Sequence, residues 1–407
     1  MAVFFVYLLA PLGLPRGEGQ FSPHSWGELE GGREGASMQP LKEIRILDLS
    51  RLLPGPYLTQ LLADLGAEVI KVETPSLGDY ARSLPPEMGM GDLFSAVNMD
   101  KKSLALDYRH AEGRELFLKL AVNADVIVES FRPGNVDKYG IGYDAVRAVN
   151  PKIVYCSISG YGQEGPYRQR AGHDLNYMSL GGAQALNGCR KEIPVPYGLP
   201  VADLSGGMLA AIAILGALVG GEGAYLDMAL LDGVISWMTP FALSAHFRGV
   251  QGTHPLAGGQ PSYNIYETAD GKHISLAALE QHFWQTFCET IERPDLLMHQ
   301  FSPDVADELT ALFRTRTQSE WIALFADKDA CVEAVLSIEE MLTSPPVQAR
   351  GHIDIGENGA ALRSPFVFAR RDRAPAPTLG ADTRPLLEEL VLDEAEFDGL
   401  VQRGIVA

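Results

Sequence analysis

A histidine and three acidic residues stand in polar breaks between apolar segments, where their side chains could carry out chemistry. His173 and Asp174 adjoin each other in AGHDLNY, Asp203 follows in PVADLSGG, and Glu267 lies in YETADG. An imidazole beside carboxyl groups suits general acid–base catalysis near neutral pH. A carboxylate such as that of Asp174 can also attack a carbonyl carbon as a nucleophile. The four residues are therefore candidate catalytic residues.

Each of them also has an ordinary structural explanation. Asp174 is a suitable N-cap for a helix that starts in DLNY, and His173 could satisfy a local carbonyl group. Asp203 precedes the small-residue helix SGGMLAAIAILGAL and could cap it. Glu267 could simply decorate a strand. Taken alone, these residues favour the capping explanation.

The composition is that of an acidic globular protein. The 407 residues exceed one ordinary core, so a large domain with a smaller one is expected. The formal net charge of −19 argues against a general nucleic-acid-binding protein, which needs a basic surface. Four widely spaced cysteines form no CxxC pair, so we expect no zinc site, no disulfide framework and a reducing, cytoplasmic location. No metal or covalently bound cofactor is indicated.

The first 37 residues differ in character from the rest. MAVFFVYLLAPLGLP faintly resembles a signal-peptide core, but no basic residue precedes it and no clear cleavage site follows. Residues 15–37 are rich in Gly, Glu and Ser, so 1–37 is expected to be a disordered leader. The longest later apolar run, 208–219, is short and interrupted by glycine, so no membrane span is expected.

The chain after residue 38 alternates strands and helices. IRILDL (44–49) suits a buried parallel strand, YLTQLLADL continues as a helix that Gly66 ends, and AEVIKVE (67–73) is the next strand. The same pattern recurs, with strands and helices predicted at 103–108, 111–122, 125–130, 143–149 and 152–159. This alternation predicts a doubly wound α/β sheet. No G-x-G-x-x-G follows the first strand, which argues against a nicotinamide-dependent dehydrogenase.

The pattern changes in the C-terminal half. A long apolar helix is predicted over 230–247, and YETADGKHISLA is predicted to form a hairpin that turns at Asp270-Gly271. Residues 282–345 are predicted to be helical, and a charged helix is expected near 384–401. These patterns divide the chain into the N-terminal part of a large domain at 38–222, a small domain at 223–340 and a return segment at 341–407 packing on the large domain.

Several motifs, taken in order, resemble the class III CoA-transferase family. They are FRPGNVDKYGIGYDAV, NPKIVYCSISGYGQEGPYRQRAGHDLNY, ADLSGGMLAA and YETADGKHISLAALE. The resemblance runs from about Lys42 to about Ile353, and the family includes carnitine CoA-transferases, formyl-CoA transferases and 2-methylacyl-CoA racemases. With it, a functional role for His173, Asp174 and Asp203 outweighs the capping explanation.

The resemblance implies a fold and an assembly. The fold is a Rossmann-like, doubly wound large domain with a smaller α+β domain, and two chains interlock as an obligate homodimer. The active site would lie between the large domain of one chain and the small domain of the other, with the glycine-rich 257–261 stretch over the partner's site. The implied partners are an acyl-CoA substrate and a second copy of the chain, without nucleic acid, membrane or metal.

One chemistry that the resemblance implies is epimerisation at the α-carbon of a 2-methylacyl-CoA. The α-proton of a thioester is weakly acidic, so inversion needs a base on one face, an acid on the other and a stabilised enolate. His173 and Asp203 match the two proton-transfer residues of the racemases, including their spacing. Glu267 falls where some racemases have a glutamate that pairs with the histidine. Helix N-termini at GHDLNY or ADLSGG could supply N–H groups to the enolate oxygen.

The other implied chemistry is transfer of CoA between an acyl-CoA and a carboxylic acid. Asp174 matches the family's nucleophilic aspartate, which forms a mixed anhydride and then an aspartyl-CoA thioester. Transferases commonly have another residue, often tyrosine, before that aspartate, whereas this chain has both racemase residues, so epimerisation is favoured. A CoA-binding sensor with a decayed site is a third alternative, which the retained acidic and imidazole groups oppose. The sequence identifies neither the acyl chain nor the donor and acceptor acids.

The phosphates of CoA require cations in this acidic chain. Arg132 in FRPG and Lys138 in VDKYG match family positions that meet these phosphates. Racemases often carry an arginine after the AEVIKVE strand, where this chain has Thr74, so Lys71 within that strand is the remaining candidate. Lys101 could add a cation or lie in a solvated turn. The other predicted substrate-binding residues are Gly172, Asn176, Tyr177 and the segment Ala105, Leu106, Asp107 and Tyr108, which would equally suit a plain core strand.

Overall fold

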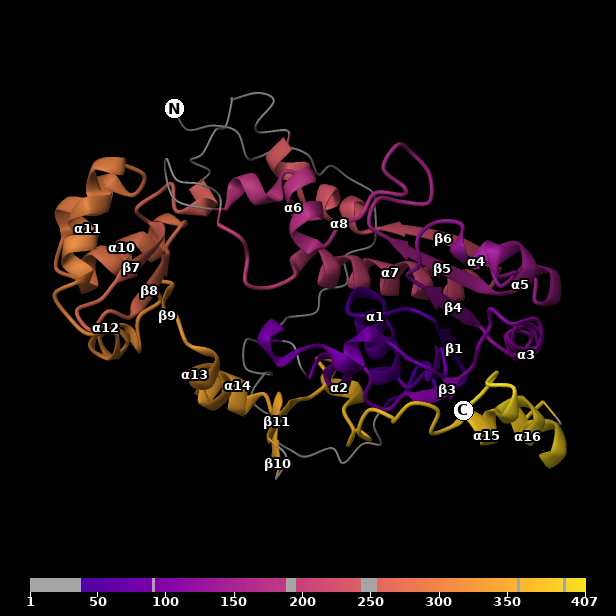
Figure 1. The fold of residues 1–407 in the computed structure, drawn as a ribbon. Helices are drawn as coiled ribbons and strands as arrows, with labels where there is room; N and C mark the ends of the chain where they lie inside the picture. Colours follow the sequence, from indigo (N-terminus) through magenta and orange to yellow (C-terminus); the bar gives the residue numbers. More distant parts are fainter. Residues whose placement is uncertain (1–37, 90–91, 188–194, 243–254, 357–358, 391–392) are drawn as a thin grey trace, which may run out of the picture. The chain divides into compact units, whose positions relative to one another are not determined.

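A parallel sheet organises the first half of the chain (Figure 1). The computed structural model describes residues 38–89, 92–187, 195–242, 255–356, 359–390 and 393–407. The six strands are β1 (Arg45–Asp48), β2 (Glu68–Glu73), β3 (Lys102–Ala105), β4 (Val126–Glu129), β5 (Val154–Ser159) and β6 (Ala224–Ala229). Their order is β3-β2-β1-β4-β5-β6, and every neighbouring pair is parallel. The predicted α/β class with a parallel sheet is confirmed.

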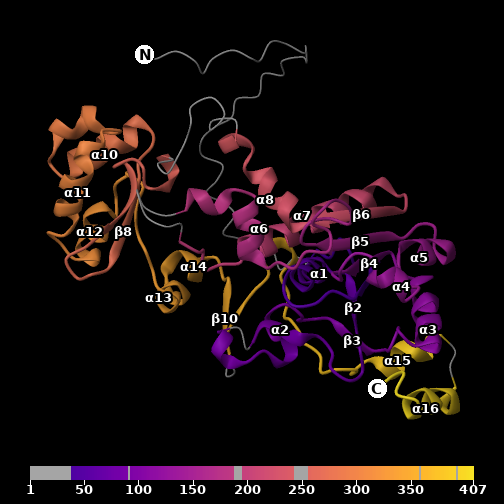
Figure 2. The same cartoon turned by 45° about the horizontal axis from the view of Figure 1, so that its top comes forward.

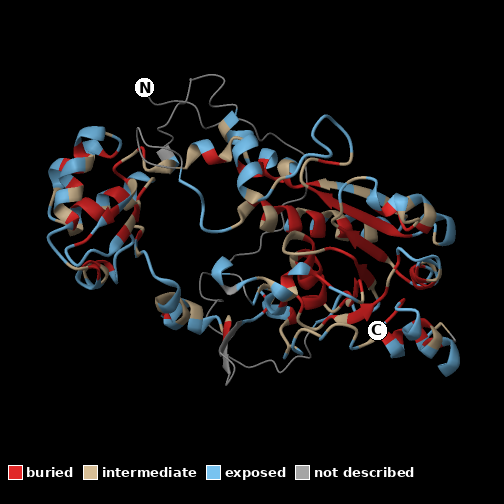
Figure 3. Ribbon diagram, viewed as in Figure 1, coloured by how far each residue is buried: buried red, intermediate tan, exposed pale blue. Residues whose placement is uncertain are grey.

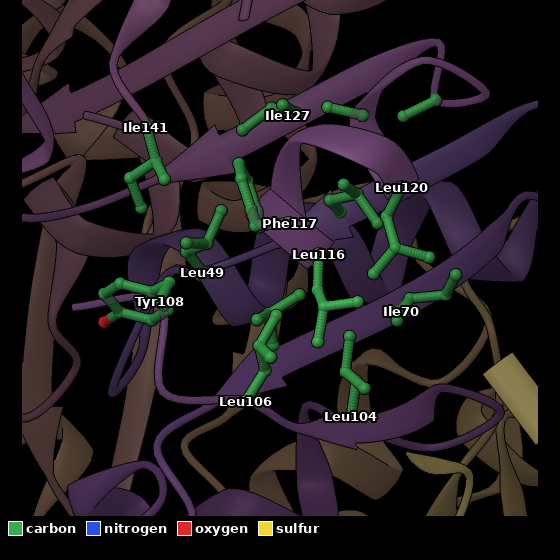
Figure 4. Close-up of a cluster of buried hydrophobic side chains, with 14 of the residues drawn as sticks. Leu49, Ile70, Leu104, Leu106, Tyr108, Leu116, Phe117, Leu120, Ile127 and Ile141 are labelled. Atoms are coloured by element: carbon green, nitrogen blue, oxygen red, sulfur yellow. The ribbon is translucent and has the colours of Figure 1, made fainter. Parts of the chain in front are cut away.

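Helices cover both faces of this sheet. Ile46 of β1 packs with Leu58 of α1 (Pro54–Asp64) and with α7 (Val201–Gly220) on one face. Its neighbour Leu47 points to the other face, where α3 (Ala111–Ala121) and α5 (Tyr143–Val149) lie, because successive strand side chains alternate. Figure 4 shows the core on the face of the sheet that α3 and α5 cover, and Figure 3 shows that burial concentrates in the strands. Strands buried on both faces explain the continuous apolar runs in the sequence.

The helix boundaries follow local signals. α1 begins at a proline, whose fixed φ suits the first helical turn, and it ends just before Gly66, which has φ +102° as a residue past a helix end often does. Short helices α2 (Leu93–Ala96), α4 (Asn135–Lys138) and α6 (Asp174–Leu180) connect the strands. The predicted boundaries of α3 and α5 agree with the structure to within one residue.

A buried network of charges holds the turn after β1. Lys101 is buried and bonds to Thr59, Asn98, the Pro56 carbonyl and the carboxylate of Asp48. Lys71 pairs with Asp79 at 3.1 Å. The carboxylate of Asp79 also accepts the backbone N–H of Leu52, which has a left-handed φ of 63°. Lys101 is therefore a structural residue and does not lie in a solvated turn.

α7 is longer than the apolar run that predicted it. It contacts α1, α6 and α8 (Leu230–Trp237) on one face, while Ile212 and Val219 on the other are 64% and 89% exposed. Among the described helices it is the one long and apolar enough to cross a membrane, a test that core helices of soluble proteins also pass. Of the helix predicted over 230–247, residues 230–237 form α8 and residues 239–242 are helical again after a turn at Met238. Residues 243–254 lie outside the described residues.

A second core lies within residues 263–334, here termed the small module. Its strands form an antiparallel sheet in the order β7 (Tyr263–Glu267), β8 (His273–Ala277) and β9 (Val332–Ala334). Its helices are α10 (Gln281–Thr290), α11 (Ala306–Phe313) and α12 (Gln318–Phe325). Trp284, Phe287 and Phe313 stack in its centre. The predicted hairpin is present with Gly271 at φ +74°, but β9 falls in a region predicted to be only helical.

The C-terminal residues return to the large sheet. The remaining elements are α13 (Ile338–Thr343), α14 (Pro345–Ala349), β10 (Ile353–Gly356), β11 (Gly359–Leu362), α15 (Thr383–Glu388) and α16 (Glu394–Gln402). β3 is an edge strand. The N–H of Ser103 donates to the side-chain carboxylate of Asp382, the carbonyl oxygen of Ser103 accepts the backbone N–H of Asp382, and Leu106 forms a β-bridge with Val406. α15 and α16 lie beside α3 in Figures 1 and 2, and their apolar residues join its core. These residues cover the edge of the sheet.

Candidate active site

His173 and Asp174 lie where α6 begins. His173 has an extended backbone (φ −127°, ψ 176°) and is exposed, and Asp174 is the first helical residue. The side-chain oxygen of Asn176 accepts the backbone N–H of His173 at 3.0 Å, which closes the first turn. His173 is thus the residue at the N-cap position, which the sequence suggested for Asp174.

The carboxylate of Asp174 is bound by the N-terminus of a different helix. Its Oδ1 accepts the backbone N–H groups of Ala202 at 2.6 Å and of Asp203 at 3.2 Å, in the first turn of α7. α7 follows Pro200, which has no capping side chain, so Asp174 supplies the missing acceptor from a distant part of the chain. Burial raises the pKa of Asp174, and the two N–H bonds oppose that rise. This contact also occupies the α7 amides that the sequence offered to an enolate oxygen.

Asp203 lies inside the first turn of α7 and does not cap it. Burial, followed by the nearby charge of Asp174, raises the pKa of Asp203 to about 7. A carboxyl group with this pKa can hold a proton at neutral pH and exchange it with a substrate. The structure therefore brings the carboxyl groups of Asp174 and Asp203 together at the start of α7, and His173 directly precedes Asp174 in the chain.

Tyr177 contacts the backbone just before His173. Its side chain is buried, and its hydroxyl donates to the carbonyl oxygen of Gly172 at 2.6 Å. Its ring meets the ring of Tyr161 edge-on, with centroids 5.2 Å apart. A hydroxyl used in this way does not support the predicted substrate contact of the Tyr177 side chain. The Asn176 side chain is likewise engaged with the backbone of His173.

Glu267 ends β7 in the small module. It is exposed, and its carboxylate pairs with the guanidinium of Arg314. Within one chain this carboxylate has a cation as its partner instead of the imidazole of His173. Its pairing with the histidine remains a prediction for a site shared between two chains.

Arg132 and Lys138 lie beyond the carboxyl end of β4. Both are exposed, and neither forms an ion pair among the described residues. The strand order reverses between β1 and β4, and ligands of open α/β sheets bind outside the carboxyl ends of strands at such a point. Both side chains are placed so that they could meet an anionic ligand there.

Arg51, which the sequence analysis missed, lies at the same point. Its backbone N–H donates to Ser130 at 3.0 Å, and its guanidinium lies 4.8 Å from the ring centre of Phe131 and 5.2 Å from that of Tyr80. It also donates to the hydroxyl of Tyr108 at 3.3 Å. The sequence signal that could have identified it is its position directly after the first strand, at the point where the strand order reverses and β4 lies next to β1.

The structure does not support the predicted phosphate contact of Lys71. Its ammonium group is buried, donates to the carbonyl oxygen of Ser50 at 2.8 Å and pairs with Asp79. Burial lowers the pKa of Lys71, but the charges of Asp48 and Asp79 outweigh that effect and leave the pKa raised. The ammonium therefore stays charged as the partner of buried carboxylates.

The segment predicted to line the adenine region is mostly core. Ala105 ends β3, and Ala105 and Leu106 are fully buried. Asp107 is partly exposed and pairs with Arg109 at 2.7 Å, and Tyr108 is buried with its hydroxyl bonded to Arg51. Within this segment, Asp107 is the residue whose side chain remains partly exposed.

Metal chemistry has no candidate ligand set in the part of the chain that the structure describes, where no group of three or more His, Cys, Asp or Glu side chains could hold an ion. The candidate reactive groups of the site are the imidazole of His173 and the carboxyl groups of Asp174 and Asp203.

Comparison with known proteins places this geometry in a family. The model of CoA-transferase family III matches residues 41–383. The succinyl-CoA:glutarate CoA-transferase of Mus musculus is 31% identical, covering 91% of this chain and 91% of that protein. The alpha-methylacyl-CoA racemase of the same organism is also 31% identical, covering 88% and 95%. Overall identity therefore does not separate the two reactions.

A solved structure shares the fold. The CAIB/BAIF family protein from Brucella suis superposes with a TM-score of 0.76 at 30% identity, covering 86% of this chain and 99% of that chain.

Proposed function

Because this chain belongs to CoA-transferase family III, whose members are CoA-transferases or acyl-CoA racemases, we propose that it epimerises the α-carbon of a 2-methylacyl-CoA. The coarser assignment, an enzyme that acts on CoA thioesters, follows from the family. The finer one depends on the carboxyl groups of Asp174 and Asp203.

The observation that supports epimerisation is the division of roles between these two groups. Asp174 is engaged by the amides at the start of α7, whereas the pKa of Asp203 is raised to about 7. In this proposal the imidazole of His173 removes the α-proton, and the electron pair of the C–H bond passes into a thioester enolate. The protonated carboxyl of Asp203 then gives its proton to the other face of the α-carbon. The reverse direction exchanges the roles, and no atom is gained or lost overall.

CoA transfer is the second candidate, because Asp174 is only partly buried and its described hydrogen bonds involve Oδ1 alone. Oδ2 would attack the donor thioester and expel CoA thiolate, which leaves a mixed anhydride on Asp174. The thiolate would then attack the aspartyl carbonyl, release the donor acid and form an aspartyl-CoA thioester. An acceptor carboxylate would reverse these steps. The relatives named as CoA-transferases favour this candidate.

The CoA moiety is proposed to lie at the carboxyl edge of the sheet. Arg132, Lys138 and Arg51 lie at the reversal between β1 and β4 and lack carboxylate partners among the described ion pairs. Their charges would offset the phosphates in a chain with net charge −19. The acyl chain is not assigned.

We also propose a homodimer with interlocked chains in a reducing cytoplasm. The exposed apolar face of α7, with Ile212 and Val219, is suited to cover by a second chain. A partner's small module would bring Glu267 to His173. The wide spacing of the cysteines in the sequence is the basis for the proposed reducing compartment.

The deciding experiment is incubation of 2-methylacyl-CoA esters in heavy water without any acceptor acid. Deuterium should enter the α-carbon, and each pure epimer should become a mixture. Absence of both over a broad set of acyl chains would overturn epimerisation. A hydroxylamine-sensitive adduct at Asp174, formed from succinyl-CoA or glutaryl-CoA, would favour CoA transfer instead.

A further inference from the structure

The peptide group that joins Gly172 to His173 is held at both of its polar ends. The hydroxyl of Tyr177 donates to the Gly172 carbonyl oxygen at 2.6 Å. The side-chain oxygen of Asn176 accepts the His173 N–H at 3.0 Å. Both supporting side chains come from the opening of α6, so the helix grips the peptide that precedes it. We call these two contacts the peptide clamp.

Glycines make room for the tyrosine of the clamp. A Cβ at Gly160 would lie 2.6 Å from the Tyr177 ring, and a Cβ at Gly172 would lie 2.8 Å from it. The Gly172 position would also press on the Tyr161 hydroxyl, at 2.7 Å. Separations below 3.0 Å force a shift of the ring, so both positions must lack a side chain for Tyr177 to reach the carbonyl.

The peptide clamp restricts the backbone position of His173. Gly172 has no side chain to restrict its backbone, and His173 is exposed, so packing alone does little to fix the imidazole. Holding both ends of one planar peptide fixes the rotations on either side of it. The Cβ of His173 and the first residue of α6 then keep one position relative to Asp203.

We propose that Asn176 and Tyr177 are positioning residues that aim the imidazole of His173 at the reacting carbon through this peptide. The proposal rests on the proposed function, because it assumes that His173 transfers a proton. In this proposal, His173 and Asp174 of the GHDLNY motif take part in the reaction, and Asn176 and Tyr177 hold the backbone of the motif in place.

The test uses variants of the full chain. Tyr177→Phe removes the donor and keeps the ring, and Asn176→Leu removes the acceptor, whereas Asn176→Asp keeps an acceptor oxygen. Tyr155→Phe is the matched control, because the buried Tyr155 donates to the Ile141 carbonyl at 3.1 Å away from the site. Each variant is assayed for α-deuteration, and the imidazole resonances of His173 are followed by NMR in histidine-labelled protein, assigned with His173→Gln.

Tyr177→Phe and Asn176→Leu should lower kcat by about 10- to 100-fold, because small displacements of a catalytic group cost this much. KM should change less than kcat, because the clamp contacts are made to the backbone of residues 172 and 173. The His173 resonances should shift or broaden in both variants. Asn176→Asp should keep more of kcat than Asn176→Leu, because it retains an acceptor oxygen, and Tyr155→Phe should behave like the wild type.

Unchanged His173 resonances in both variants would overturn the clamp, whatever reaction the protein performs. Changed resonances with an unchanged kcat would overturn its role in catalysis. If Tyr155→Phe lowers kcat as much as Tyr177→Phe and Asn176→Leu do, the loss reflects general stability, and the proposal is also overturned. If the wild type itself shows no α-deuteration, the proposed function fails, and the NMR comparison still decides whether the clamp holds the imidazole.

Discussion

The carboxylate of Asp174 accepts the backbone N–H of Asp203 at 3.2 Å, so the first turns of two helices meet through one acidic residue. The same contact places the anion of Asp174 close to the side chain of Asp203, whose pKa is raised to about 7. Burial raises the pKa of both carboxyl groups, and at Asp174 the N–H groups of α7 oppose that rise. Two neighbouring carboxyl groups in different environments can act as an acid–base pair.

Replacement of Asp203 by Asn should abolish most of the proton transfer. The amide cannot take up or release a proton, so α-deuteration should fall by about 10²- to 10⁴-fold. Asp232→Asn is the matched control, since Asp232 lies in the first turn of the neighbouring α8 and is exposed. Racemisation by Asp203→Asn at the wild-type rate would remove Asp203 from the mechanism.

The pH dependence of stability should carry the signature of Asp203. Its pKa of about 7 in the folded chain exceeds the ordinary value of 3.8. Between these values the folded chain keeps a proton that the unfolded chain releases, so rising pH favours unfolding. The free energy of unfolding of the wild type, minus that of Asp203→Asn, should therefore fall from about pH 4 to about pH 7 and then level off. Urea titrations of both proteins measure it, and a difference that rises with pH would contradict the assignment.

Asp174 should matter for stability as well as for chemistry. Asp174→Ala removes the acceptor at the start of α7 and should lower the free energy of unfolding by about 1 kcal/mol. Asp174→Asn keeps an oxygen acceptor and should lose less. The two also separate the candidate reactions, because a racemase should keep part of its activity in Asp174→Asn, whereas a transferase should lose all CoA exchange. Chemical denaturation and an exchange assay with labelled acid measure both effects.

Arg132 and Lys71 should behave differently although both were predicted to bind CoA. Arg132→Gln should raise KM about tenfold or more, the cost of one charge-assisted bond, with little change in stability. Lys71→Met should instead cost about 3–5 kcal/mol of stability, because it leaves buried carboxylates without their cation. The exposed Arg147 provides the control variant Arg147→Gln. An increase in KM for Lys71→Met without loss of stability would restore its predicted role.

Local sequence signals predicted much of the large sheet. The apolar runs before Asp48 and around Ile70 suited strands buried on both faces, and Gly66 marked the helix end between them. Two features of the C-terminal half were not predicted. The break after α8 at Met238 precedes Pro240, which cannot continue the hydrogen bonding of that helix, and β9 is three residues long, too short to show an alternation.

For the site, the sequence predicted which residues belong to it better than it predicted which groups those residues bind. That His173, Asp174 and Asp203 belong together followed from motif resemblance, but the bond from the α7 backbone to Asp174 is a long-range contact with no local signature. Lys71 was misjudged because a lysine in a strand is equally consistent with an exposed edge, and its burial depends on Asp79, which lies in a separate turn. Arg51 was missed for the corresponding reason, since its ring partners Tyr80 and Phe131 come from distant segments of the chain.

The edge strand β3 is covered by residues 382–383 and 405–406, which lie about 300 positions away in the sequence. Without these contacts, the backbone groups of Ser103–Leu106 on that side of the sheet would be unpaired and open to strands of other chains. The return of the chain to β3 therefore protects the sheet from edge-to-edge association as well as completing its fold.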